Sequence, residues 1–130
     1  MRSFEFPAEV VEAFTDGDCA LLAVAIHDLT GYPLVTASSE LDDRQWYHAG
    51  VFISSGEVLD INGVSSVTDW LEFWAKDWDI DCEAGFLPDG DDFILRSWER
   101  DALLISNRGR LHFPEVDATV WAAEVVKVLG

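Results

Sequence analysis

The sequence has few cysteines, few basic residues and no long hydrophobic run, and each shortage excludes a class of protein. Two cysteines, Cys19 and Cys82, are too few for a disulfide framework, and no Cys-x-x-Cys pair indicates a zinc site. No stretch of about 18 apolar residues is present to cross a membrane, and Met1–Glu5 lack the apolar core of a signal peptide. We therefore expect reduced thiols and a cytoplasmic protein without membrane contact.

Sequence motifs of nucleotide and metal chemistry are also missing. The chain has no Gly-rich phosphate loop, no dinucleotide-binding fingerprint, no His-x-x-x-His pair and no basic patch interleaved with aromatic residues. These absences argue against nucleotide enzymes, zinc peptidases and direct nucleic-acid binders. We expect no cofactor and no metal ion.

What the chain has in excess is negative charge, with 25 acidic against 8 basic residues and a formal net charge of −17. The charge is concentrated in the middle of the chain: eleven acids between Glu57 and Asp92 face Lys76 alone, whereas acids and bases balance from Phe93 onward. Such a field repels nucleic acid and steers association with a basic partner surface. The alternative, to which we give equal weight, is a solvated face that aids solubility.

If the acidic band binds a partner, that partner is expected to be the basic surface of a nucleic-acid-binding protein or complex. The candidate contact residues are Asp69, Glu72, Asp77, Asp79, Asp81, Glu83, Asp89, Asp91 and Asp92.

A chain of 130 residues is expected to form one domain, large enough to bury a single core. The stretch from Cys19 to Leu29 is apolar almost all round, and the turn Asp16–Asp18 and Gly31 bound it, so it predicts a helix buried on most sides. Cys19 begins this helix, where the positive end of the helix dipole stabilises a thiolate. The alternative is that Cys19 is a small buried hydrophobic residue, the commonest fate of a free cysteine.

A β-hairpin is predicted further along the chain. Val51–Ile53 is typical of a strand, Ser54-Ser55-Gly56 of a tight turn, and Val58–Ile61 of a second strand. His48 lies near the start of the first strand and Asp60 near the end of the second, so antiparallel pairing is expected to place them side by side. A Cys–His–Asp triad needs this geometry, because the histidine takes the thiol proton and the aspartate fixes the tautomer of the histidine.

These residues together carry a resemblance to a known family. The order Gly17-Asp18-Cys19 at the start of a buried helix, His48-Ala49-Gly50-Val51 at a strand start and Leu59-Asp60 on the next strand resembles papain-like cysteine peptidases of the compact NlpC/P60 kind. The resemblance covers about residues 14 to 64. It implies Cys19 as nucleophile, His48 as general base and Asp60 as orienting residue.

The fold class that we expect is α+β, with a papain-like core. In this prediction the helix from Cys19 packs on an antiparallel sheet that contains residues 33 to 37, 47 to 53 and 57 to 61. The first of these segments is expected to be an edge strand, because Pro33 lacks the N–H of a ladder donor.

The remaining segments complete the prediction. Residues 6 to 14 are expected to form a short helix, and the capping box from Ser66 to Asp69 opens another that ends at about Trp78. Asp117 is a good N-cap for a last helix, Ala118–Leu129. Between them we expect a hairpin of 103 to 105 with 110 to 113. His27 and His112 are expected to be structural.

Two functions of different class follow from the sequence. The first is a small acidic inhibitor that binds a basic nucleic-acid-binding partner, a description that DNA-mimic and anti-CRISPR proteins of phages and other mobile elements resemble. The alternative is an active cysteine hydrolase or amidase that uses Cys19, His48 and Asp60. Size and charge favour the inhibitor, because 130 residues leave little room for a substrate subdomain, whereas the candidate triad favours the hydrolase.

Overall fold

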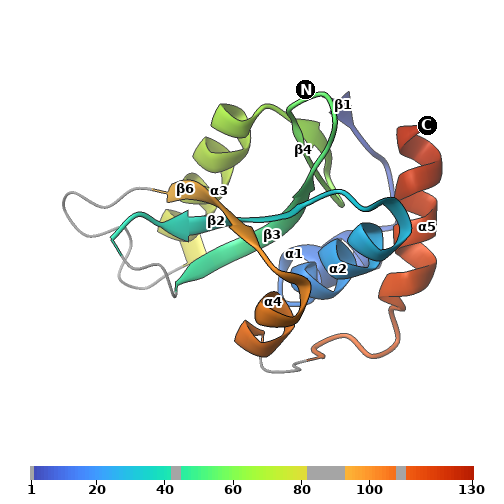
Figure 1. Ribbon diagram of the computed structural model, residues 1–130. Helices are drawn as coiled ribbons and strands as arrows, with labels where there is room; N and C mark the ends of the chain where they lie inside the picture. Colours follow the sequence, from blue (N-terminus) through green and yellow to red (C-terminus); the bar gives the residue numbers. More distant parts are fainter. Residues whose placement is uncertain (1, 42–44, 82–92, 108–110) are drawn as a thin grey trace.

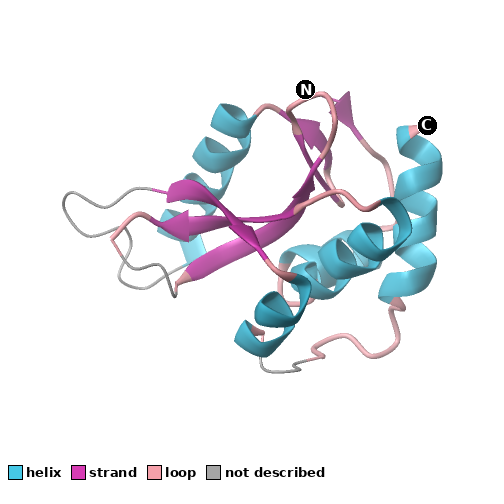
Figure 2. Cartoon of the chain, in the orientation of Figure 1, coloured by secondary structure: helices cyan, strands magenta, loops and turns pink. Residues whose placement is uncertain are grey.

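The structure is a computed structural model in which residues 2–41, 45–81, 93–107 and 111–130 are described. Within these ranges the chain forms five helices and a six-stranded antiparallel sheet, so the predicted α+β class is confirmed (Figure 1 and Figure 2). In chain order the elements are β1 (Arg2–Ser3), α1 (Ala8–Thr15), α2 (Cys19–Thr30), β2 (Leu34–Ser39), β3 (Trp46–Phe52), β4 (Val58–Asp60), β5 (Gly63–Ser65), α3 (Val67–Asp81), β6 (Phe93–Trp98), α4 (Arg100–Ser106) and α5 (Ala118–Leu129).

The sheet has the strand order β1-β5-β4-β3-β2-β6, and every neighbouring pair is antiparallel. The predicted hairpin is confirmed, because Val51 of β3 lies opposite Leu59 of β4. Its loop is closed by a hydrogen bond from the backbone N–H of Ile53 to the carbonyl of Glu57, at 2.9 Å. Gly56 supplies the positive φ of 83° that this loop requires.

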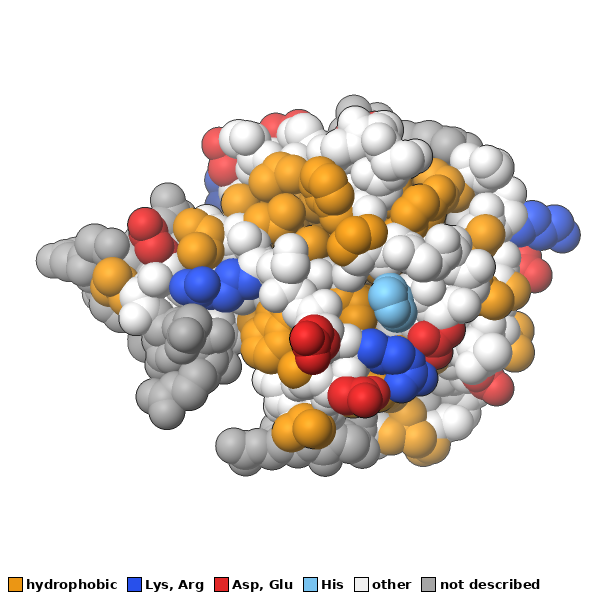
Figure 3. All heavy atoms as spheres, viewed as in Figure 1, with side chains coloured by type: hydrophobic (Ala, Val, Ile, Leu, Met, Phe, Trp, Pro, Cys, Tyr) orange, Lys and Arg blue, Asp and Glu red, His pale blue; other side chains and the backbone are white. Residues whose placement is uncertain are grey.

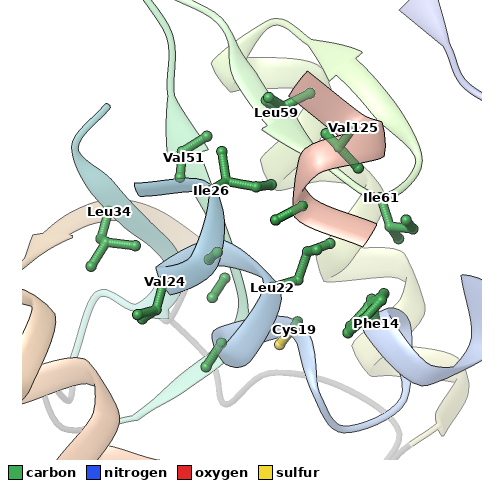
Figure 4. Close-up of a cluster of buried hydrophobic side chains, with 14 of the residues drawn as sticks. Phe14, Cys19, Leu22, Val24, Ile26, Leu34, Val51, Leu59, Ile61 and Val125 are labelled. Carbon is green, nitrogen blue, oxygen red and sulfur yellow. The ribbon is translucent and has the colours of Figure 1, made fainter. Parts of the chain in front are cut away.

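The helices cover both faces of the sheet. The larger core cluster joins α1, α2, α4 and α5 to one face, and the smaller cluster joins α3 to the other. Side chains of α2, such as Leu22 and Ile26, lie at the centre of the larger cluster with Leu34, Val51 and Val125 around them (Figure 4). The prediction of a central helix buried on most sides is therefore confirmed.

Local signals set the ends of the helices as predicted. Gly31 follows α2 in the left-handed conformation, with φ of 77°. The hydroxyl of Ser66 accepts a hydrogen bond from the N–H of Asp69 at 3.1 Å at the start of α3. The carboxylate of Asp117 accepts from the N–H of Thr119 at 2.9 Å at the start of α5.

The prediction that the strand after Pro33 is an edge strand is wrong. β2 lies between β3 and β6 and pairs with both. Pro33 precedes the strand, so its missing N–H removes no ladder bond, and its carbonyl accepts from the N–H of Phe52 at 2.9 Å. On this side of the sheet the edge strand is β6, and β1 forms the opposite edge.

The hairpin predicted for residues 103 to 113 is also wrong. Residues 100–106 form α4, and 111–113 lie outside any strand. Helical geometry lets Leu103 be fully buried in the core while Ile105 is left 76% exposed, which a strand pairing of the whole apolar run would not achieve. The Arg100 guanidinium adds a bidentate ion pair to Asp28, at 2.8 and 3.0 Å, which joins α4 to α2.

Candidate functional site

Cys19 is the first residue of α2 and is only 6% exposed. Figure 4 shows it at one end of the core cluster, on the first turn of the helix. The turn before it is anchored by Asp18, a fully buried residue whose carboxylate accepts from the backbone N–H groups of His112, at 2.8 Å, and Phe113, at 3.0 Å. The start of α2 is therefore held in place by a distant part of the chain.

His48 lies on β3, and an irregularity in strand pairing precedes it. Ala37 of β2 lies opposite His48, but the next residue, Ser38, lies opposite Trp46, so β3 has one more residue than β2 at this point. Such a bulge re-aims the side chains beside it. Here both Tyr47 and His48 contact the same indole ring, that of Trp74 on α3.

Asp60 is the last residue of β4 and binds His48 directly. Its Oδ2 lies 3.1 Å from Nε2 of His48, and both side chains are buried. The same oxygen accepts from Nε1 of Trp70 at 2.9 Å, and Oδ1 accepts from the N–H of Asn62 at 2.9 Å. Three donors thus orient this carboxylate, and the predicted proximity of His48 and Asp60 is confirmed.

The electrostatics of the site join Cys19 to this pair. Burial disfavours a charged ring and lowers the pKa of His48, but the negative charge of Cys19, the hydrogen bonds to Asp60 and Cys19 and the charge of Asp60 outweigh burial. Together they raise the pKa of His48 from 6.5 to about 9. At neutral pH the ring therefore favours the imidazolium form.

Nδ1 of His48 is buried and has no hydrogen bond of regular geometry within the described ranges. Nε2 is occupied by Asp60, and the Cys19 thiol is close enough to influence the same ring electrostatically. Cys19, His48 and Asp60, which the sequence predicted to meet, therefore act on one another in the structure.

Two residues of the site were missed by reasoning from sequence. Trp70 binds Asp60, and Trp74 stacks on His48 with ring centroids 3.6 Å apart and planes 20° apart. Because Trp70 and Trp74 are four residues apart on a helix, the sequence predicted only that they lie on the same packing face. A buried indole usually needs a hydrogen-bond acceptor, and this was the signal that a carboxylate lies nearby.

Two of the predicted partner-binding acids have described side chains. Asp69 and Glu72 lie exposed on α3. The side chains of Asp77, Asp79 and Asp81, and all of Glu83, Asp89, Asp91 and Asp92, lie outside the described residues, as does Cys82.

The other two histidines bind oxygen atoms of the protein. His27 Nδ1 lies 2.7 Å from the carbonyl oxygen of Tyr32, and His112 Nδ1 lies 3.2 Å from the buried carboxylate of Asp18. Among the described residues no group of three or more His, Cys, Asp and Glu side chains is placed to hold a metal ion. In the same part of the chain, no helix has the length and apolar character needed to cross a membrane.

Comparison with protein families, with curated proteins and with solved structures finds no match to this chain. What the site can do therefore follows from its own geometry.

Proposed function

We propose that this protein is a cysteine hydrolase that cleaves a peptide, isopeptide or other amide bond. The observation that supports it most is the buried hydrogen bond between His48 of β3 and Asp60 of β4, together with the electrostatic effect of Cys19 of α2 on the same ring. In this proposal Cys19 is the nucleophile, His48 exchanges protons, and Asp60 orients the ring.

The architecture supports a papain-like core as the framework of this site. A buried helix begins with the candidate nucleophile and packs on an antiparallel sheet. Two neighbouring strands of that sheet then supply the histidine and the aspartate, in the chain order that the resemblance implies.

The reaction proceeds in two balanced steps. The thiolate of Cys19 attacks the carbonyl carbon, a C–S bond forms, the C–N bond breaks, and the His48 imidazolium gives its proton to the leaving amine. Water, deprotonated by His48, then attacks the thioester. The C–S bond breaks, the acid product leaves, and the thiolate and the imidazolium are restored.

The start of α2 offers donors for the oxyanion that forms in each step. The first N–H groups of a helix have no acceptor within the helix. Asp18 stands at the N-cap position but makes no side-chain cap bond within the described residues, because its carboxylate is bound to His112 and Phe113. In this proposal the N–H groups at the start of α2 bind the developing negative charge.

The proposal is tested with a library of peptides that carry a thiol-reactive group in place of the scissile amide. We expect covalent labelling of Cys19, seen by mass spectrometry, that is lost in Cys19→Ser and reduced at least about tenfold in His48→Gln. Cys82→Ser is the matched control and should label like the wild type. Labelling that is unaffected by His48→Gln contradicts the proposal.

A second candidate is the inhibitor that binds a basic nucleic-acid-binding partner. It is supported by the net charge of −17 and by the exposure of Asp69 and Glu72 on one helix.

The test of this second candidate is competition with DNA for binding to a nucleic-acid-binding complex. Binding of the protein to that complex should weaken steeply with rising salt, because charges are screened beyond about 8 to 10 Å near physiological ionic strength. Reversal of Asp77, Asp79 and Asp81 to Lys should abolish binding, whereas Cys19→Ala should preserve it. Salt-independent binding contradicts this candidate.

A further inference from the structure

Two tryptophans of α3 brace the histidine and the aspartate in different ways. Trp70 donates its indole N–H to Oδ2 of Asp60, the same oxygen that binds His48. Trp74, one helical turn later, is only 2% exposed and lies face to face with the imidazole of His48. The two indoles therefore contact successive members of one hydrogen-bonded chain.

The geometry of the Trp74 contact is unusual for two neutral rings. Neutral aromatic pairs prefer offset or edge-to-face arrangements with centroids about 4.5 to 7 Å apart. The ring centroids of His48 and Trp74 are 3.6 Å apart with planes 20° apart, so one ring lies almost directly over the other. A positively charged ring favours this arrangement, because the face of an indole carries negative charge.

The hydrogen-bonding state of Trp74 points the same way. Its Nε1 is buried and has no hydrogen-bond acceptor within the described ranges, unlike Nε1 of Trp70. A buried donor left without an acceptor is unfavourable. Among the described residues, the polar group that the indole of Trp74 contacts is the imidazole of His48, on which it stacks.

Neighbouring rings hold the indole of Trp74 in this orientation. Tyr47 meets it edge-on at 5.9 Å between centroids, and Phe73 does so at 4.9 Å. The charged groups that act on the His48 ring are Cys19 of α2 and Asp60 of β4. The two indoles of α3 also lie against this ring. Trp74 stacks on one face of it, and Trp70 lies at a tilt to it.

We propose that Trp74 is a positioning residue whose indole face covers the imidazolium of His48 and holds the ring so that Nε2 faces Asp60 and Nδ1 faces Cys19. This inference rests on the proposed function for its catalytic meaning. The structural part of it, the stabilisation of the charged ring, does not depend on any substrate.

The test follows the ring signals of His48 by NMR as a function of pH, with His27→Gln and His112→Gln used for assignment. Trp74→Leu keeps an apolar cover over the ring but removes the aromatic face, and Trp74→Phe keeps a weaker aromatic face. Trp121→Leu is the matched control, because Trp121 lies on α5 and its ring contacts Phe6, whereas the rings that lie against His48 are those of Trp70 and Trp74.

We expect Trp74→Leu to lower the protonation constant of His48 at least about tenfold, which is one pKa unit. Trp74→Phe should lower it less, and Trp121→Leu should leave it unchanged. The rate at which iodoacetamide alkylates Cys19 at pH 7 should fall in Trp74→Leu and be largely rescued in Trp74→Phe.

An unchanged His48 titration in Trp74→Leu overturns the inference. If that variant does not fold, Trp74→Phe decides alone, because a protonation constant equal to or above that of the wild type also overturns it. Failure of the proposed function would appear elsewhere, as a lack of peptide-probe labelling in a wild-type protein whose His48 titration still responds to Trp74.

Discussion

Asp60 receives three hydrogen bonds, and this sets the chemistry of the residue that it orients. With Nε2 of His48, Nε1 of Trp70 and the N–H of Asn62 around it, the carboxylate has little freedom to turn away from the ring. His48 in turn has Nε2 bound to Asp60, and the Cys19 thiol acts electrostatically on the same ring. At the scale of single residues, Trp70, Asp60 and His48 form a buried hydrogen-bonded chain.

The stability of the protein should depend on pH through His48. The pKa of this residue is about 9 in the folded protein against 6.5 for the ordinary side chain, so the folded state binds the proton more tightly. The stabilisation is fully present below about pH 6.5 and is lost as pH rises through about 9. Its upper limit is about 3 kcal/mol, from 1.36 kcal/mol per pKa unit.

Urea unfolding at pH 6 and at pH 9.5 measures this effect. We expect the free energy of unfolding to fall between these pH values in the wild type, and to fall less in His48→Gln. An equal pH dependence in both proteins would show that another group is responsible.

At the scale of elements, the approach of α3 to the sheet depends on a residue without a side chain. A Cβ atom on Gly50 of β3 would lie 2.8 Å from the carbonyl oxygen of Leu59 and 3.3 Å from Cζ2 of Trp70. Gly50 therefore allows Trp70 to reach Asp60. The position of the helix that braces the site is thus coupled to the hairpin that carries His48.

Gly50→Ala should disturb both stability and the site. We expect a loss of about 1 to 3 kcal/mol in the free energy of unfolding, as for other overpacked cores, together with slower alkylation of Cys19. Gly31→Ala is the control, because a Cβ there meets nothing within 4 Å but must adopt φ of 77°. It should cost about 1 to 2 kcal/mol and leave the alkylation rate unchanged. Equal alkylation rates of Cys19 in Gly50→Ala and Gly31→Ala would show that Gly50 does not influence the site.

At the scale of the whole molecule, the net charge of −17 is the dominant quantity. The face drawn in Figure 3 carries acidic, basic and apolar side chains side by side, so the excess of negative charge does not cover that face uniformly. Self-repulsion among so many acids disfavours the compact state, and salt screens it.

Salt should therefore stabilise the protein. We expect the melting temperature to rise between about 20 mM and about 500 mM sodium chloride, since the Debye length falls from tens of ångströms to a few. Asp69→Lys with Glu72→Lys, two exposed positions of α3, should raise the melting temperature at low salt and reduce the effect of added salt. A melting temperature that does not respond to salt would mean that repulsion among the acidic side chains contributes little to the stability of the protein.

The sequence by itself determined the elements that depend on neighbouring residues. The helix that begins at Cys19 and ends before Gly31, the hairpin around Gly56 and the last helix after Asp117 were predicted close to their observed bounds. Turn and cap signals act over a few residues, so they can be recognised without the fold. The approach of His48 to Asp60 followed from the same hairpin, whereas the catalytic roles stay a prediction.

Only the tertiary structure decided how distant segments meet. β2 was expected at an edge of the sheet, but it is an inner strand because β6 pairs with it. Residues 103 to 105 were expected in a strand, but they belong to α4, which buries Leu103. The contacts of Trp74 with His48 and of Asp18 with the chain at His112 join segments far apart in sequence. Such contacts depend on which apolar faces are buried together, and a local pattern of residues does not predict which faces these will be.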